Sequence, residues 1–232
     1  MEPATKKRRM HDEITIDCSH QKLSNIEEYF KKNFKTPPDV TKLNVSNNYV
    51  TTLSPKDCDG NILFNTNNLI KINAGANNLT EIPLMTEFPN CVELCLNNNK
   101  IGSMSYSLSG NNTLERLDLR FNRIKIIENM NHLTQLKSLT LSSNQIESLD
   151  GLPDQMPQLQ FLGLFCNKLS DFEHTLSILK KYPSITDLYI AGNPIYPVEI
   201  SGGNKNHQKA TEIIKLLPNL KWLNGERVNI IL

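Results

Sequence analysis

The chain has 232 residues, of which 38% are hydrophobic and 21% charged, and its 25 Lys and Arg against 24 Asp and Glu give a net charge of +1. Because binding to nucleic acid or anionic lipid through an overall field needs many cations, this balance disfavours a general polyanion binder. No stretch approaches the about 18 consecutive apolar residues of a membrane span, and no signal-peptide-like apolar run opens the chain. We therefore expect a soluble intracellular protein that does not enter membranes.

The N-terminus carries one sharp cluster of positive charge. Lys6, Lys7, Arg8 and Arg9 follow Pro3 and precede acidic residues, a pattern similar to a monopartite nuclear-import signal. The other interpretation is a basic tail that no import receptor recognises, because short clusters of this kind are common. We expect residues 1–13 to be a disordered basic tail and the protein to be nuclear, or otherwise cytoplasmic.

An eleven-residue frame repeats along most of the chain. The segment from Leu114 to Ile124 matches LxxLxLxxNxL at every defined position, and the same frame starts again at Val40, Leu69, Cys91, Leu136, Leu159 and Ile185. An eighth, degenerate copy around Ile16 has Gln21 in the Asn place. Chance does not keep one residue type in one position across seven copies. The invariant residues, at position 9 of the frame, are Asn48, Asn77, Asn99, Asn122, Asn144, Asn167 and Asn193.

The frame has a direct physical meaning. The LxL alternation predicts a short strand with one buried face, and successive strands stack into a parallel sheet over a continuous apolar core. The recurrent Asn lies where the chain leaves the strand, where its amide would satisfy buried backbone groups of its own turn and of the neighbouring repeat. From about Ile14 onward the pattern resembles the leucine-rich-repeat family. The resemblance implies an α/β solenoid: a right-handed arc with a concave parallel sheet and a convex side of 3₁₀ turns and short helices.

Repeat length predicts what lies on the convex side. The central repeats of 22 to 23 residues are too short for full helices, so 3₁₀ or irregular backbone is expected there. Two capping-box patterns, Ser24-x-x-Glu27 and Ser170-x-x-Glu173, predict helices in the longer end repeats. The insertion at residues 54–68 is rich in Pro, Asp, Gly and Asn, which predicts a loop.

The frame lapses after Asn193 and returns as a final half-copy from Leu216 to Val228. This segment is similar to the C-terminal cap of short-repeat leucine-rich proteins, in which a helix closes the array, although Asn224 stands where Asp is usual. We expect a helix from about His207 to Leu217, with Ala210, Ile213, Ile214 and Leu217 directed inward. The predicted organisation is an array of about eight repeats over residues 14–198 and a cap over residues 199–232.

Residue patterns typical of catalysis are missing from the sequence. The five histidines are isolated from one another, and there is no HExxH, CxxC, Walker or GxSxG pattern. We therefore expect no enzymatic activity, no cofactor and no metal site.

Function is then expected on the concave face, where positions 3, 5, 7 and 8 of the frame point outward. This face is polar in the early repeats and aromatic in the late ones, which favours a protein-binding surface because aromatic and Arg residues dominate interfaces. The predicted binding residues are Glu93, Arg116, Asp118, Arg120, Phe121, Phe161, Phe165, Asp187, Tyr189 and Trp222. We expect Phe161, Phe165, Tyr189 and Trp222 to form one patch bordered by Arg116, Arg120 and Asp187.

The spacing and the cap resemble the phosphatase-1 regulatory leucine-rich subunit, the acidic leucine-rich nuclear phosphoproteins, the spliceosomal A′ protein, the axonemal dynein light chain and the repeat domain of the RNA-export receptor TAP. What this resemblance implies is an adaptor that binds a protein partner, often in a nuclear complex, and is a monomer outside that complex. The competing hypothesis is RNA binding, ribonucleoprotein assembly or RNA export, supported by the basic tail and by Lys42 and Lys71 on the early strands.

Overall fold

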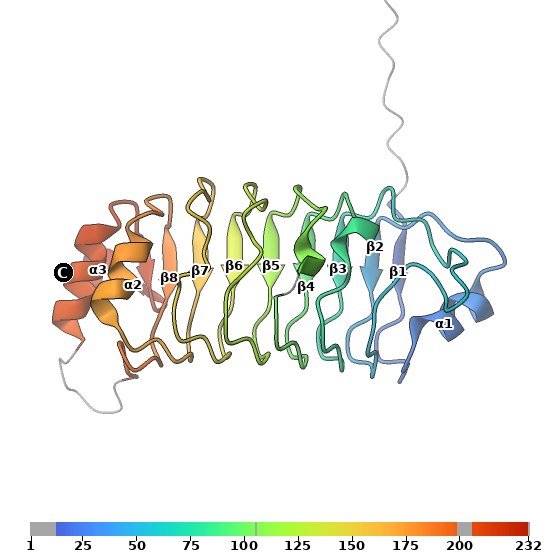
Figure 1. Ribbon diagram of the computed structural model, residues 1–232, viewed down its shortest axis with the longest axis horizontal. Helices are drawn as coiled ribbons and strands as arrows, with labels where there is room; N and C mark the ends of the chain where they lie inside the picture. The colour runs from blue at the N-terminus through green and yellow to red at the C-terminus, as the bar shows by residue number, and fades with distance from the viewer. Residues whose placement is uncertain (1–12, 105, 199–205, 232) are drawn as a thin grey trace, which may run out of the picture.

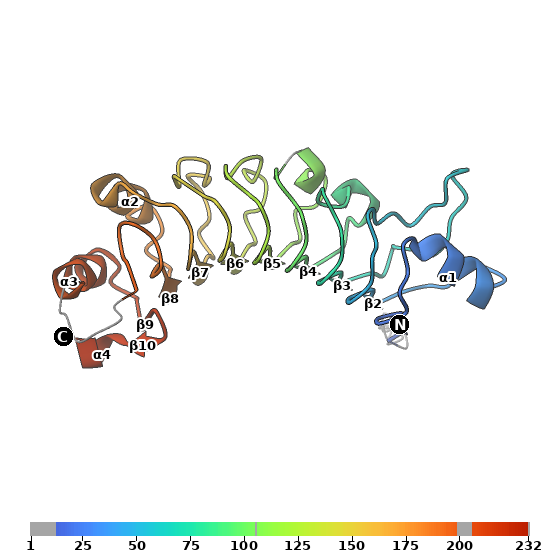
Figure 2. The ribbon, with the colours of Figure 1, turned by 90° about the horizontal axis from the view of Figure 1, so that it is seen from below.

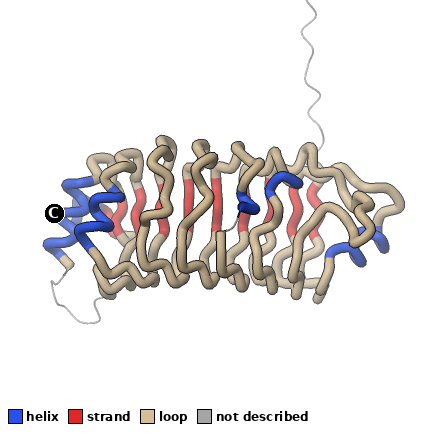
Figure 3. Tube along the Cα trace, in the orientation of Figure 1, coloured by secondary structure: helices blue, strands red, loops and turns tan. Residues whose placement is uncertain are grey.

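The chain folds into an arc of stacked coils. The computed structural model describes residues 13–104, 106–198 and 206–231, and its strands form one ten-stranded sheet in sequence order (Figures 1 and 2). The sheet lines the concave side of the arc, and most of the helices and the connecting loops lie on the convex side (Figure 2). Figure 3 shows the strands, in red, side by side along the length of the arc. The basic cluster at residues 6–9 lies outside the described residues.

The strands are β1 (Thr15–Asp17), β2 (Lys42–Asn44), β3 (Lys71–Asn73), β4 (Glu93–Cys95), β5 (Arg116–Asp118), β6 (Ser138–Thr140), β7 (Phe161–Gly163), β8 (Asp187–Tyr189), β9 (Trp222–Leu223) and β10 (Glu226–Arg227). The helices are α1 (Ile26–Asn33), α2 (Phe172–Leu179), α3 (His207–Leu216) and α4 (Val228–Ile231), with short 3₁₀ helices η1 (Met85–Glu87) and η2 (Tyr106–Leu108).

Each strand from β2 to β8 consists of positions 3 to 5 of the repeat frame. Neighbouring strands from β1 to β9 pair in parallel without slippage, so Leu117 of β5 aligns with Leu139 of β6 and then with Leu162 of β7. These central residues are buried in one continuous apolar core, while positions 3 and 5 face the concave side. The structure therefore confirms the leucine-rich-repeat solenoid and its inward register.

The position-9 asparagines bind the coils to one another. Asn122 Nδ2 donates to the carbonyls of Leu119 in its own repeat and Leu96 in the preceding one, each at 3.0 Å. Its Oδ1 accepts the backbone N–H of Ile101 at 3.0 Å. The same two hydrogen bonds, from Nδ2 to one carbonyl of its own repeat and to one of the preceding repeat, recur in the other six copies and confirm the predicted role. These copies carry Asn48, Asn77, Asn99, Asn144, Asn167 and Asn193.

The residue before each ladder Asn adopts left-handed backbone geometry, which the sequence pattern did not reveal. Position 8 has φ between 54° and 77° in every copy, including the degenerate first one. Such values are unusual for residues other than glycine. The residues are His20, Asn47, Ala76, Asn98, Phe121, Ser143, Cys166 and Gly192.

The convex side follows the predicted lengths. Short 3₁₀ helices serve two of the central repeats, and full helical turns occur in the longer end repeats. Both predicted N-caps are wrong by one residue: Asn25, rather than Ser24, accepts from the N–H of Glu27, and Asp171, rather than Ser170, accepts from the N–H of His174. All four residues belong to types that cap helices almost equally well, so tertiary packing decides which one does so.

The insertion at residues 54–68 is a loop, as predicted, and it packs against α1. Phe64 of the loop stacks on Phe30 of α1 with ring centroids 4.7 Å apart. The carboxylate of Asp57, only 1% exposed, accepts the backbone N–H of Asn61 at 2.8 Å and pairs with Lys31 Nζ of α1 at 2.9 Å. The loop and α1 together cover the N-terminal end of the core.

The C-terminal end differs from the rest of the sheet. The helix α3 spans the predicted segment and buries Ala210 and Ile213, while Ile214 is only partly buried. The chain then forms β9 and turns back as β10, which is antiparallel to β9. Both turn residues, Asn224 and Gly225, have positive φ, the geometry of a type I′ hairpin. The assignment of residues 199–232 as a cap stays a prediction, and residues 199–205 lie outside the described residues.

Candidate functional site

The concave face carries two clusters of side chains separated by one strand. Charged groups occupy β3 to β5 and aromatic groups occupy β7 to β9. Between them, β6 presents the small hydroxyl side chains of Ser138 and Thr140. The ten sequence-predicted residues are therefore divided by the structure instead of forming one group.

Position 3 of the early strands forms a ladder of alternating charge. Glu93 on β4 accepts from Lys71 Nζ on β3 at 2.7 Å and from Arg116 Nη1 on β5 at 2.6 Å. The hydrogen bond from Lys71, together with the charges of both cations, lowers the pKa of the Glu93 carboxyl. Both cations are thereby neutralised within the sheet.

Position 5 and the strand end hold a second ion pair. Arg120 binds the carboxylate of Asp118 through Nε at 3.0 and 3.1 Å and through Nη2 at 2.7 Å. The hydrogen bond to Asp118 raises the pKa of the Arg120 guanidinium. Arg116 and Arg120 thus belong to the charged cluster, and the predicted border of the aromatic patch is not formed by them.

The aromatic cluster is defined here as Phe161, Tyr189 and Trp222. The rings of Phe161 on β7 and Tyr189 on β8 lie with centroids 5.4 Å apart and planes inclined by 32°. Tyr189 also reaches toward the hairpin turn, since a Cβ placed on Gly225 would lie 3.8 Å from its Cε1. All three aromatic side chains are half-buried, so each combines a packed side with an accessible one.

Asp187 lies inside this cluster by strand register. It aligns with Phe161 on one side and with Trp222 on the other, and Tyr189 follows two residues along the same strand face. Adjacent strands are about 4.8 Å apart, which brings these four side chains into one neighbourhood. Of the predicted residues, the structure unites Phe161, Asp187, Tyr189 and Trp222.

Phe121 and Phe165 occupy the turns that leave β5 and β7. Phe121 is 57% exposed and Phe165 is 38% exposed, large values for aromatic side chains. Phe165 follows the strand that carries Phe161, whereas Phe121 follows a strand of the charged cluster.

Sequence reasoning missed one participant, Arg227. Its guanidinium carbon lies 5.2 Å from the centroid of the Trp222 ring, a cation–π contact made across the β9–β10 hairpin. The dipeptide Asn224-Gly225 is the strongest short-range hairpin signal and would have predicted the return of the chain.

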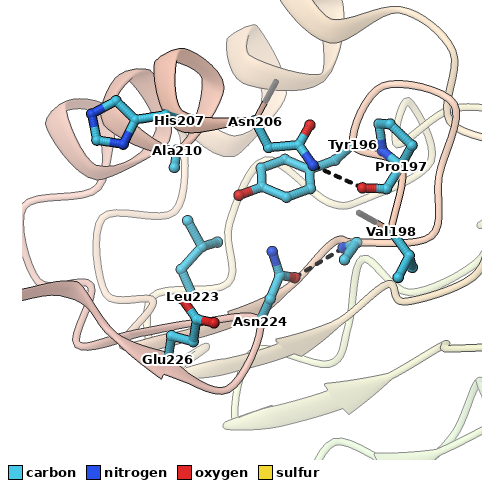
Figure 4. A pocket seen from close by; sticks show the side chains of 10 residues that line it. Tyr196, Pro197, Val198, Asn206, His207, Ala210, Leu223, Asn224 and Glu226 are labelled. Carbon is cyan, nitrogen blue, oxygen red and sulfur yellow. Dashed lines mark hydrogen bonds between the residues drawn. The ribbon is translucent and has the colours of Figure 1, made fainter. Parts of the chain in front are cut away.

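Two hollows lie outside the concave strands, and the polar groups described in each already bind other protein groups. One, of about 380 Å³, lies between the segment after β8 and α3 (Figure 4). There Asn206 Nδ2 donates to Pro197 O at 2.7 Å and Asn224 Oδ1 accepts from Ala191 N at 2.9 Å, so both amides hold the backbone around it. The other, of about 640 Å³, lies on the convex side beside the 54–68 insertion, and its two charged groups, Lys56 and Glu87, lie 3.6 Å apart.

One convex cluster has the residue types of a catalytic triad but the wrong order. Asp150 accepts from Ser148 Oγ and contacts His174 Nε2, both at 2.6 Å, so the carboxylate separates the hydroxyl from the imidazole. A hydroxyl nucleophile needs the imidazole as its base. These hydrogen bonds, that of Ser148 first, lower the pKa of Asp150.

No group of three or more potential metal ligands occurs in the part of the chain that the structure describes. Nor is any described helix long and apolar enough to span a bilayer.

Comparisons with known proteins agree with this architecture. The family model "Leucine Rich repeats (2 copies)" matches residues 112–154 and 134–179. Acidic leucine-rich nuclear phosphoprotein 32 family member A of Drosophila pseudoobscura pseudoobscura is 32% identical over 133 residues, 57% of this chain and 47% of that protein. The chain thus spans less than half the length of this relative. Dynein axonemal light chain 1 of Danio rerio is 30% identical over 175 residues, 66% of this chain and 83% of that protein.

Solved structures share the fold at low sequence identity. An internalin from Listeria monocytogenes superposes with a TM-score of 0.67 and 21% identity, covering 92% of this chain and 54% of the internalin. A second internalin, C2, gives a TM-score of 0.64 with 20% identity over 90% of this chain and 79% of its own. Seven copies of the frame, the asparagine ladder and these relatives lead to one conclusion. The chain belongs to the leucine-rich-repeat family.

Proposed function

We propose that the protein is a non-enzymatic interaction scaffold that binds a partner protein on its concave face, with the aromatic cluster as the centre of the contact. The observation that carries this proposal is the half-buried Phe161–Tyr189 pair, which places two large rings side by side on an open sheet. Aromatic residues held rigidly at the centre of a surface are the type that contributes most to protein–protein affinity. Phe165, exposed at the end of β7, extends the same surface.

The charged cluster supports a protein partner over RNA. Lys42 pairs with Glu13 and Lys71 pairs with Glu93, and these two lysines were the concave residues that favoured the RNA hypothesis. A cation already held by a carboxylate contributes little to phosphate binding, because the phosphate must displace the carboxylate before the cation can neutralise it. The ion pairs instead give the scaffold a face that is polar and nearly neutral beside the aromatic cluster.

We further propose that the complex is nuclear. The supports are the Lys6 to Arg9 cluster and the similarity to proteins named acidic leucine-rich nuclear phosphoprotein. The similarity to dynein axonemal light chains supports the other location, the cytoplasm or the axoneme. Replacing Lys6, Lys7, Arg8 and Arg9 by Ala in a bulky fluorescent fusion should shift the fusion out of the nucleus. Unchanged nuclear accumulation would refute the signal.

Affinity purification with mass spectrometry, before and after nuclease treatment, tests the scaffold proposal. We expect the same major protein partner in both samples, and we expect it to be lost with the variant Tyr189→Ala. The control variant Asp154→Asn alters an exposed convex carboxylate that pairs with Lys181 and should retain the partner. If nuclease removed every partner, the protein-scaffold proposal would give way to RNA-dependent assembly.

A further inference from the structure

The carboxylates of the concave face differ in how they are neutralised. Glu93 and Asp118 each pair with at least one cation at 2.7 Å or closer. Asp187 is different: no Lys, Arg or His within the described ranges lies at ion-pair distance from it. Its Oδ2 accepts a hydrogen bond from Thr186 Oγ1 at 2.6 Å, which leaves Oδ1 available to a ligand.

The surroundings of this carboxylate are aromatic. Register places Phe161 and Trp222 on the two strands that flank Asp187, and Tyr189 on the same face of its own strand. The strip of Ser138 and Thr140 separates this group from the charged ladder, so no early-strand cation reaches it. A negative charge between aromatic faces attracts cations through both the ion pair and the ring quadrupoles.

The molecule itself shows that these rings accept a cation. Arg227 lies over Trp222 at 5.2 Å, although Asp187 occupies the strand next to Trp222. The guanidinium therefore takes the aromatic face and leaves the carboxylate unpaired. This internal contact shows that the face of the Trp222 ring on the hairpin side holds a positive group.

We propose that Asp187, Phe161, Tyr189 and Trp222 form a receptor for one cationic side chain of the partner, a lysine, a methylated lysine or an arginine. This inference rests on the proposed function, because it names the chemistry that the aromatic cluster recognises. The cationic head contacts Asp187 at the accessible side of the rings, while its aliphatic stem lies along the rings. A partner segment with a basic residue at its centre fits this face, and an acidic or purely apolar segment does not.

Trp222 is the only tryptophan of the chain, so its fluorescence reports on this site alone. The probes are end-blocked peptides Gly-Gly-X-Gly-Gly in which X is lysine, trimethyl-lysine, arginine, glutamate or norleucine, titrated to millimolar concentration against the full chain. We expect a saturable change in emission with the three cationic peptides and none with glutamate or norleucine. An equal response to norleucine, or no response to any cationic peptide, would overturn the proposal.

Variants separate the contributions of the charge and the rings. Asp187→Asn should weaken binding of the lysine peptide at least fivefold, whereas the convex control Asp154→Asn should leave it unchanged. Arg227→Ala removes the internal cation and should tighten binding at least twofold. Unaltered affinity in Asp187→Asn would overturn the role of the carboxylate.

The purified partner distinguishes this inference from the scaffold proposal. If Tyr189→Ala weakens partner binding and Asp187→Asn does not, the scaffold proposal stands and the cation receptor fails. If neither variant weakens partner binding, the concave binding site itself fails. Loss of partner affinity in both variants, together with the selectivity among the peptides, supports both.

Discussion

The ring of Phe161 reaches the ring of Tyr189 on the next strand, at a centroid distance of 5.4 Å, by crossing the position of Gly163. A Cβ placed on Gly163 would lie 3.3 Å from Phe161 Cε1 and 2.9 Å from Thr140 Cγ2. A side chain at this position would therefore push the ring away from its partner. The missing side chain of Gly163 therefore leaves room for the two rings to meet on the concave sheet.

Removal of an aromatic ring from the concave face should weaken the partner complex. Phe165→Ala is expected to reduce affinity by about 1 to 2 kcal/mol, the range of a substantial interface residue, and to leave the thermal midpoint nearly unchanged because Phe165 is exposed. Tyr189→Ala should weaken binding similarly but also cost up to about 1 kcal/mol of stability, since it loses a ring contact. Calorimetric titration and thermal melts measure the two effects separately.

Full affinity in both variants would move the binding site elsewhere. The convex hollow beside the 54–68 insertion would then be the next candidate, because it exposes Ile62 and Leu84 at its rim. If Phe165→Ala lowered the thermal midpoint as well as the affinity for the partner, this ring would support the fold instead of the interface.

Phe121 offers a test in which stability and binding change in opposite directions. Its φ of 54° is unfavourable for a bulky residue, while asparagine tolerates this geometry. Phe121→Asn should therefore stabilise the fold by about 0.5 to 1 kcal/mol, a gain of about 2 °C in the thermal midpoint. If Phe121 belongs to the binding surface, partner affinity falls at the same time.

The matched control for this strain is Gly192 at the same position of another repeat. A Cβ on Gly192 would lie 2.7 Å from Cys166 Sγ, and its φ is +77°. Gly192→Ala should therefore lower the thermal midpoint, opposite to Phe121→Asn. A destabilised Phe121→Asn variant would mean that contacts of the ring outweigh the backbone strain.

The fold was predictable from sequence because its signal is repeated. The period-2 alternation around Leu117 and the Asn at position 9 each occur in seven copies, so strand register and ladder follow directly from them. The N-caps were not predictable to the residue, because Ser24 precedes an equally good cap, Asn25. The left-handed geometry at position 8 was hidden, since residues as different as Ala76 and Phe121 occupy it.

The candidate site was predictable in composition but not in arrangement. The frame placed Phe161, Tyr189 and Trp222 on one face, and register confirms that placement. It could not show that Arg116 turns toward Glu93 on the preceding strand, because either neighbouring strand lies within reach of an arginine. Nor did it place Arg227 over Trp222, which depends on the hairpin that follows β9.

The asparagine ladder makes a strong prediction about stability. Asn122→Ala removes the donors to Leu96 O and Leu119 O and the acceptor of Ile101 N–H. The two carbonyls each keep one amide donor, from Asn99 and Asn144, but the buried N–H of Ile101 loses its partner. We expect a loss of at least about 2 kcal/mol in the free energy of unfolding, measured by urea denaturation. Asn112→Ala, at an exposed position, is the control and should change stability by less than about 0.5 kcal/mol. Equal stability of the two variants would show that water replaces the ladder.

Asp57 should make the stability of the N-terminal end depend on acid. Hydrogen bonds from Asn61 and Lys31 hold the pKa of its carboxyl well below the ordinary range, and the pKa of Lys31 is raised above its own by Glu27 and Asp57. A carboxyl with a lowered pKa in the folded state stabilises the fold above about pH 4, its unfolded pKa. This contribution is lost progressively as the pH falls from there toward the folded pKa.

The variant Asp57→Asn isolates this effect. It removes the charge that pairs with Lys31 across the junction of α1 and the insertion, so its thermal midpoint at pH 7 should lie below that of the wild type. As the pH falls from 4 to 2.5, the wild type loses the same interaction and the two midpoints should converge. Asp59→Asn, at an exposed position two residues away, should follow the wild-type curve throughout. If the midpoints of wild type and Asp57→Asn stayed a constant distance apart down to pH 2.5, Asp57 would be excluded as the acid-sensitive group. Its pairing with Lys31 would then contribute nothing to stability.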